Sequence, residues 1–324
     1  MHATSGLCRL ATYLGGFWLL LLGSGQAQAQ SAPPPPPAAN ADRVNSISSL
    51  LGSRYDPWLD PTRGSHAPSS PGDEDLGEQL ILTPLSVYKP FNFQIAQQAM
   101  WTDNAALTDG DELSDFYSNT ELRLSYMPQI WANTYAQFDA RYSFYRYADH
   151  SSLDFDNLEA AVGLLHVLRD LNDLSVWLHY NHTRLLTASG GDELFTDHAI
   201  EAGLYLPITL HPRHIMYAGY TSEFSLDANP GYSGRHEHTL SLGYRFRATD
   251  RIHLESYYQF AYYDYREGGR DDLLHSAGIA LTTYLTERID LVLSANYSLN
   301  DSDLAGADYE VGDLGALLSL RFEF

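Results

Sequence analysis

Several short clusters of histidine, aspartate and serine contain the residue types of a hydrolytic active site. A nucleophilic triad needs a hydroxyl beside a histidine that a carboxylate orients. In "YNHTRL", His182 and Thr183 would point to opposite faces of an extended strand. His198 is expected to face His182 across a hairpin, but no serine lies beside either histidine. The run "DHSS" at 149–152 is compact but falls in a loop, where adjacency in sequence is weak evidence for a triad.

Two further pairs could serve a protease or a metal site. Asp154 and Asp156 share one face of a strand, as in an aspartate-based protease, but no Asp-x-His pattern lies on a facing strand. His236 and His238 could bind a metal, but a third ligand is missing from their surroundings in the sequence. No CxxC, HExxH or glycine-rich phosphate motif occurs. We therefore expect no enzyme, no cofactor and no metal site.

The charge balance limits the partners of the chain. Its 324 residues carry 19 Lys and Arg against 41 Asp and Glu, for a formal net charge of −22. A nucleic-acid partner would need a basic face, so we expect none. Many acids fall in Asp- and Gly-rich stretches such as "DGDEL", "EGGRDD" (which includes Asp272) and "NDSDLAGADYEVG". We interpret these as solvated loops; a rim that binds divalent cations is the alternative.

The first 90 residues differ from the rest. Arg9, the apolar run "ATYLGGFWLLLLG" and a small-x-small site at Ala27 to Ala29 indicate a signal peptide at 1–29. The single cysteine, Cys8, lies inside it. Residues 30–90 are rich in proline, serine and glycine and are interpreted as a disordered tail. Residues 91–324 form the folded domain.

Residues 91–324 consist of segments with alternating apolar and polar side chains, as in β-strands. The prolines that follow Pro90 are placed at the joins between strands; they are Pro128, Pro207, Pro212 and Pro230. We expect about twelve strands, near 91–102, 115–126, 133–147, 154–168, 173–187, 194–206, 213–226, 236–247, 251–265, 272–285, 288–299 and 312–324.

The joins between these segments alternate between tight turns and longer loops, and both ends of the domain fall on the tight side. This pattern predicts an antiparallel up-and-down meander with an even number of strands. In a soluble barrel of so many long strands, the apolar interior would be too wide to fill. An apolar face toward lipid and a polar face around the lumen remove that difficulty.

The chain ends in "LLSLRFEF", a strand whose outward face includes Phe322 and Phe324. This terminus resembles the last strand of bacterial outer-membrane β-barrel proteins, in which a terminal aromatic residue is an assembly signal. The resemblance covers about 91–324 and matches no characterised subfamily. It implies an outer-membrane location in a Gram-negative-type envelope, with the tail and both termini in the periplasm. The implied partners are outer-membrane lipids, lipopolysaccharide and the barrel-assembly machinery.

Charge pairing predicts the strand registers. We expect Arg123 opposite Asp139, and Glu121 opposite Arg141, because a slip by two residues would put Glu121 opposite Asp139, a pair of like charges. A tight turn at "ATD" would set Arg245 opposite His253 and diagonal to Glu255. Leu281 is expected opposite Leu293, His179 opposite Glu201, and Trp177 over Gly203. The predicted lumen residues are Glu121, Arg123, Asp139, Arg141, Glu159, His179, Glu201, Arg245, Glu255, Arg321 and Glu323.

A lumen of mixed charge fits two functions. One is a porin-like channel for small polar solutes. The other is a sealed structural barrel that binds a partner through its tail or its acidic loops. An outer-membrane hydrolase is a third and weaker hypothesis. The sequence leaves open the identity of the solute, the oligomeric state and the register of individual strands.

Overall fold

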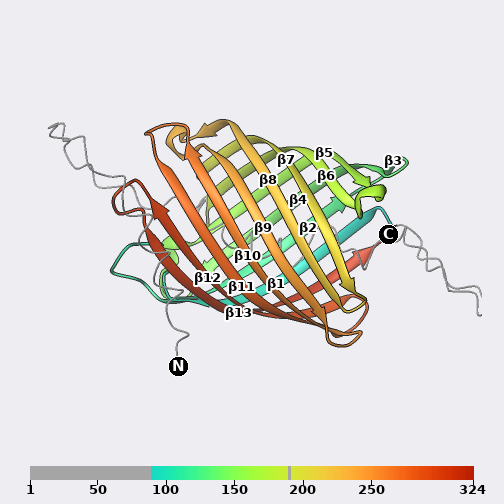
Figure 1. Cartoon of the computed structure of the whole chain (residues 1–324). Helices are drawn as coiled ribbons and strands as arrows, with labels where there is room; N and C mark the ends of the chain where they lie inside the picture. The colour runs from blue at the N-terminus through green and yellow to red at the C-terminus, as the bar shows by residue number, and fades with distance from the viewer. Residues whose placement is uncertain (1–88, 189–190) are drawn as a thin grey trace, which may run out of the picture. The chain divides into compact units, whose positions relative to one another are not determined.

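The computed structural model describes residues 89–188 and 191–324. Most of this part of the chain is β-strand (Figure 1). The strands are β1 Phe91–Thr102, β2 Asp115–Tyr126, β3 Gln129–Trp131, β4 Thr134–Tyr147, β5 Phe155–Leu168, β6 Leu174–Thr187, β7 Glu193–His211, β8 His214–Asn229, β9 Arg235–Arg247, β10 Ile252–Tyr265, β11 Asp271–Tyr284, β12 Ile289–Ser302 and β13 Tyr309–Glu323. Single 3₁₀ turns occur at Ser151–Leu153, Arg169–Leu171 and Gly231–Ser233.

Twelve long antiparallel strands close into a barrel, as the alternating pattern predicts. Each strand pairs with its neighbours in sequence, and β1 pairs with both β2 and β13. Pairing of β2 with β4 completes the wall, while the three-residue β3 adds a short flap on β4. Closure leaves no long strand with a free edge, which is the requirement for crossing a bilayer with strands.

The two faces of the wall differ in chemistry. Outward side chains are apolar and exposed along the whole circumference; Leu178, Ile279 and Leu314 each have 57–59% of their surface accessible. Inward side chains such as Gln98, Asn119 and Ser143 are buried and polar. A water-soluble protein rarely exposes a continuous apolar surface of this extent. The apolar face is therefore built to contact lipid.

The loops are longer at one end of the barrel than at the other (Figure 1). The loop after β1 spans 103–114, whereas β7 and β8 are joined by residues 212–213 alone. Strand β1 begins, and β13 ends, at the short-turn end; Phe324 donates to Phe91 O at 2.9 Å there. This arrangement matches the predicted meander.

Strand β7 extends to His211 instead of ending at 206, because Pro207 does not mark a join. Strand β8 extends to Asn229 instead of ending at 226. Pro207 lies inside β7 and pairs with Tyr217 of β8. The β6–β7 ladder ends at Tyr205, so beyond that residue β7 has a neighbour on one side only. A proline is tolerated there because its missing N–H faces the unpaired side.

The predictions of a signal peptide at 1–29 and a tail at 30–90 fall, except for the last two residues, outside the described residues. Among residues 89–188 and 191–324, none of the helical turns has the length or apolarity needed to cross a membrane.

Candidate functional site: a charged cavity in the lumen

The inward faces of β2 to β11 enclose a cavity of about 390 Å³. Period-two alternation puts every second side chain of each strand on this wall. Eight of the eleven predicted lumen residues line the cavity: Arg123, Asp139, Arg141, Glu159, His179, Glu201, Arg245 and Glu255. Glu121, Arg321 and Glu323 also lie on inward positions but not among the residues that line it.

Arginine–carboxylate pairs connect β2, β4 and β5. Arg123 Nε lies 2.9 Å from Asp139 Oδ1. Arg141 pairs with Glu159 of the next strand, and its Nη1 lies 3.9 Å from Glu121 Oε2. All five side chains are mostly shielded from solvent, and charge-assisted bonds in such surroundings are stronger than those at a surface. These bonds fix the arginines against the wall.

The predicted register of β2 and β4 is wrong by two residues. Arg123 lies opposite Arg141, Ser125 opposite Asp139, and Glu121 opposite Ser143. The two arginines tolerate this position because each side chain reaches diagonally to a carboxylate. The expected Arg123–Asp139 ion pair therefore forms, but between diagonal neighbours instead of directly opposed ones.

The predicted register of β9 and β10 is also wrong. Arg245 lies directly opposite Glu255, with 2.9 Å between Nε and Oε2, and His253 lies opposite Arg247. The turn between β9 and β10 contains more residues than the tight turn that "ATD" predicts. Thr249 Oγ1 accepts the Ile252 N–H at 3.0 Å, and this bond shapes the wider turn.

Predicted pairings on β6, β7, β11 and β12 are confirmed. His179 is opposite Glu201, and Trp177 is opposite Gly203. The Trp177 Nε1 donates to Glu201 Oε1 at 2.6 Å, and His179 Nε2 lies 2.5 Å from Gln137 Oε1. Leu281 and Leu293 are likewise opposite one another on the outward face.

Two acidic residues of the cavity were missed from the sequence. Glu223 of β8 lies opposite Glu201, and Glu237 of β9 lies opposite Glu223, so three carboxylates follow one another across adjacent strands. Asn181 donates to Glu201 at 3.0 Å and to Glu223 at 2.8 Å. The alternation of side chains indicates the position of Glu223. Glu201 points inward, and the β7–β8 pairing places Glu223 opposite it on the same face.

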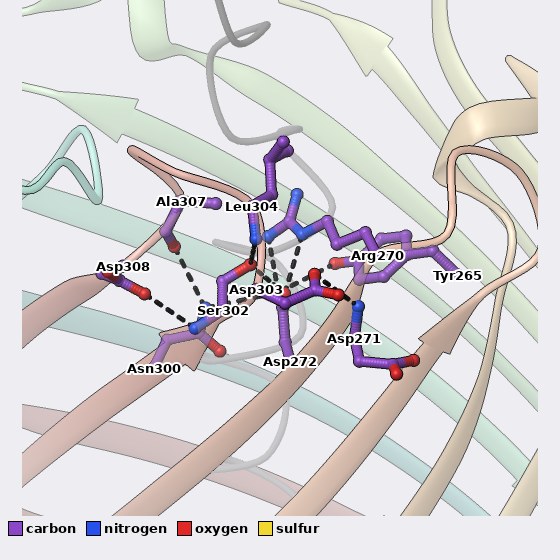
Figure 2. A network of polar contacts seen from close by, with 10 residues as sticks. All are labelled: Tyr265, Arg270, Asp271, Asp272, Asn300, Ser302, Asp303, Leu304, Ala307 and Asp308. Carbon is purple, nitrogen blue, oxygen red and sulfur yellow. Dashed lines mark hydrogen bonds and ion pairs between the residues drawn. The ribbon is translucent and has the colours of Figure 1, made fainter. Parts of the chain in front are cut away.

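Several acids that we interpreted as solvated loop residues are buried instead. Figure 2 shows Asp272 at the long-loop end of β11, where it is only 2% exposed. Arg270 Nε donates to its Oδ1 at 2.8 Å, and Ser302 Oγ donates to the same atom at 2.5 Å. Asn300 and Tyr265 also point at this carboxylate. Asp272 thus joins β10, β11 and β12 at the mouth of the barrel.

Some of the hydrolase candidates contact partners that the sequence did not indicate. His182 and His198 stack on the outward face, with 4.4 Å between ring centroids. His150 bonds to Asp115 of β2 at 2.9 Å, a pairing that its own neighbours in sequence did not indicate. Asp156 forms an ion pair with Arg146 at 2.7 Å.

The histidines of "RHEH" have aromatic and hydroxyl neighbours. His236 packs on Phe224, and His238 Nδ1 lies 2.9 Å from Ser222 Oγ. Within the residues that the structure describes, no three His, Cys, Asp or Glu side chains are grouped as metal ligands.

Comparisons with known proteins establish the fold. No protein-family model matches the chain, and no curated protein matches its sequence. Among solved structures, an outer-membrane channel from Pseudomonas putida is similar over 73% of this chain and 97% of its own, with 12% identity and a TM-score of 0.50. The NanC porin matches over 70% of this chain and 100% of its own, with 12% identity and a TM-score of 0.43. The translocator domain of the autotransporter NalP from Neisseria meningitidis matches over 88% and 97%, with 12% identity and a TM-score of 0.44. The chain therefore has the fold of an outer-membrane β-barrel, and no characterised subfamily is matched by sequence.

Proposed function

We propose that this chain is a porin-like channel of a Gram-negative-type outer membrane and that it passes small polar solutes. The observation that carries the proposal is the cavity of about 390 Å³ inside a closed barrel, lined by charged and polar side chains. A barrel that only anchored a partner would have no need for a charged cavity along its axis. For this chain, a partner bound through the tail or the acidic loops, the contacts with lipid and lipopolysaccharide, and the use of assembly machinery stay predictions.

Buried polar atoms support a hydrated lumen. In the described chain, the side chains of Gln98, Asn119, Ser143 and Ser319 each have a buried polar atom without a hydrogen-bond partner in the protein. Burying a polar group without a partner is costly, so groups of this kind are normally satisfied by water. Their inward positions show that the wall of the lumen is polar, which favours a hydrated lumen over an apolar, sealed core.

The lining charges indicate the selectivity. Three arginines line the cavity, and each has a carboxylate partner: Arg123, Arg141 and Arg245. Six acidic side chains line it, so carboxylates are in excess. A passage with an excess of one charge raises the local concentration of the opposite ion. We infer that the channel prefers cations to anions.

The test is single-channel recording of the refolded mature protein in a planar bilayer, first with residues 31–90 and then without them. A steady conductance with a reversal potential that favours cations is expected, and Glu223→Gln combined with Glu237→Gln should weaken that preference. Asp250→Asn is the matched control, because its carboxylate is exposed at a short turn away from the cavity. Silence in both forms, from a barrel shown to be folded, would contradict the channel and leave the anchor hypothesis.

A further inference from the structure

The loop between β1 and β2 turns back into the barrel. Loops of this length normally run over the surface, where water satisfies their backbone. Here Asn104, Ala105 and Leu107 are at most 1% exposed. The second half of the same loop is open to solvent, and Leu113 is 39% exposed. The first half of the loop is therefore part of the barrel's interior.

Leu107 is held in an apolar pocket at the long-loop end. It belongs to a cluster with Ala261, Tyr263, Tyr265, Leu274, Tyr309 and Val311 of β10, β11 and β13. Tyr263 and Leu274 also line the polar cavity, so this cluster lies at the end of that cavity. Leu107 has a φ of 52°, which a leucine rarely adopts. Backbone strain of this kind persists only where the surrounding contacts enforce it, and it is found often in switch regions.

Asn104 fixes the loop in this position. Its Nδ2 donates to Glu310 O of β13 at 2.9 Å and to Thr108 O at 2.9 Å. Its Oδ1 accepts the Thr108 N–H at 3.1 Å. One fully buried side chain thus ties both sides of the Leu107 turn together and attaches them to the wall.

Apolar side chains line the other side of the same mouth. Ala105 belongs to a second buried cluster with Met100, Tyr117, Tyr145, Tyr147, Phe155, Leu185 and Phe195. Two residues of one loop therefore contact separate apolar clusters, one centred on β2 to β7 and the other on β10 to β13. Toward the long loops, the polar cavity is followed by these two apolar clusters, which the loop connects. Charged groups border the second cluster, because the Arg235 guanidinium lies over the Tyr263 ring and Asp272 accepts from Tyr265.

We propose that residues 103–108 form a hydrophobic gate at the long-loop mouth, latched by Leu107 and Asn104. This inference rests on the proposed channel function. With the latch docked, the loop and the two apolar clusters that it contacts disfavour water and hydrated ions, as hydrophobic constrictions do in other channels. Release of Leu107 from its pocket widens the mouth and lets polar solutes reach the cavity.

Thiol labelling tests the latch without requiring conduction. Cys8 is the only cysteine of the sequence, so a Cys8→Ser background accepts single probes. Leu107→Cys should react at least about ten-fold more slowly than Leu113→Cys in the same loop, because a buried thiol is protected until the loop opens. Asn104→Asp keeps the shape of the side chain but loses both donated bonds, and it should speed labelling at position 107. Equal rates at 107 and 113 would overturn the docked latch.

Single-channel recording then tests the gate. Asn104→Asp and Leu107→Gly should each raise the open probability several-fold, whereas Leu113→Ala should leave it unchanged. Heat-modifiable migration shows that each variant has folded. If labelling shows release but conductance does not change, the gate is refuted and the channel stands. If no folded form conducts, including the unmodified protein, the channel itself is refuted, while the labelling still reports the position of the loop.

Discussion

Gly203 and Trp177 show how tightly the inner wall of the barrel is packed. A Cβ atom at Gly203 would lie 2.1 Å from Trp177 Cζ2 and 2.4 Å from Cε2. The same indole donates its N–H to Glu201 at 2.6 Å. The indole would have to move to make room for a side chain at position 203. That movement would also disturb Glu201, which lies beside Glu223 in the cavity.

Gly203→Ala should therefore destabilise the barrel. We expect the free energy of unfolding to fall by about 1–3 kcal/mol, as in other overpacked sites. Gly219→Ala on β8 is the matched control, since its nearest contact would be Leu204 O at 3.4 Å. That variant should change the free energy by less than about 0.5 kcal/mol. Denaturant unfolding in lipid vesicles measures both, and equal losses would contradict the packing argument.

For single residues, the sequence predicts the face of the wall on which a side chain lies better than it predicts the residue opposite it on the next strand. Alternation alone placed Arg123, Arg141 and Arg245 inward, and the structure agrees. The predicted registers of Arg123 and Arg245 are wrong in opposite ways: Asp139 is diagonal to Arg123 where direct opposition is predicted, and Glu255 is directly opposite Arg245 where a diagonal position is predicted. The Arg123 side chain is long enough to pair diagonally with Asp139. The register that two strands adopt depends on all the strands that they contact, and a comparison of two strands alone does not include the others.

Among the elements, the seam between β1 and β13 closes the barrel. Phe91 and Phe324 exchange two backbone hydrogen bonds, at 2.9 and 3.3 Å. Phe93 and Phe322 stack on the outward face, with ring centroids 6.3 Å apart. The final aromatic residue is thus a structural partner as well as a predicted assembly signal, and the two roles need to be separated.

Deleting Phe324 separates them. Loss of two backbone bonds at the edge of a long ladder should reduce refolding in vitro only slightly. If assembly machinery reads the residue, the fraction of folded barrel in cells should fall several-fold. Leu318→Ala, an outward change on the same strand, is the control. Equal losses in cells and in vitro would show that Phe324 acts through stability alone.

Strand positions were the easiest elements to predict, because alternation persists along each segment. The predicted end of β7 is wrong, because Pro207 does not mark a boundary. Whether a proline can remain within a ladder depends on where the neighbouring strand stops, here at Tyr205 of the β6–β7 pairing. That is a property of the assembled sheet. The inward turn of 103–108 was missed for a similar reason, since its contacts lie on β2 to β7 and on β10 to β13, far from it in the sequence.

For the molecule as a whole, the orientation of the two faces decides the environment. The outward face of β12 carries Leu291, Leu293, Ala295 and Tyr297, and the inward face carries serine and asparagine. A barrel in water would be least stable with this arrangement. A barrel in a bilayer would be most stable, because the apolar band contacts lipid and the closed wall gives each long strand a neighbour on both sides.

Arginine substitutions along β12 test that orientation by depth. Leu293→Arg, near the middle of the apolar band, should cost about 2–4 kcal/mol of folding free energy in a bilayer, whereas the cost near an interface should be about 0–1 kcal/mol. Ile289→Arg, at the short-turn end of the same strand, supplies the interface case. Reversible folding into lipid vesicles measures the difference. A loss of folding free energy that is the same at both positions would mean that the apolar face does not lie in lipid. The proposed channel would then be contradicted, because it requires a barrel that spans a membrane.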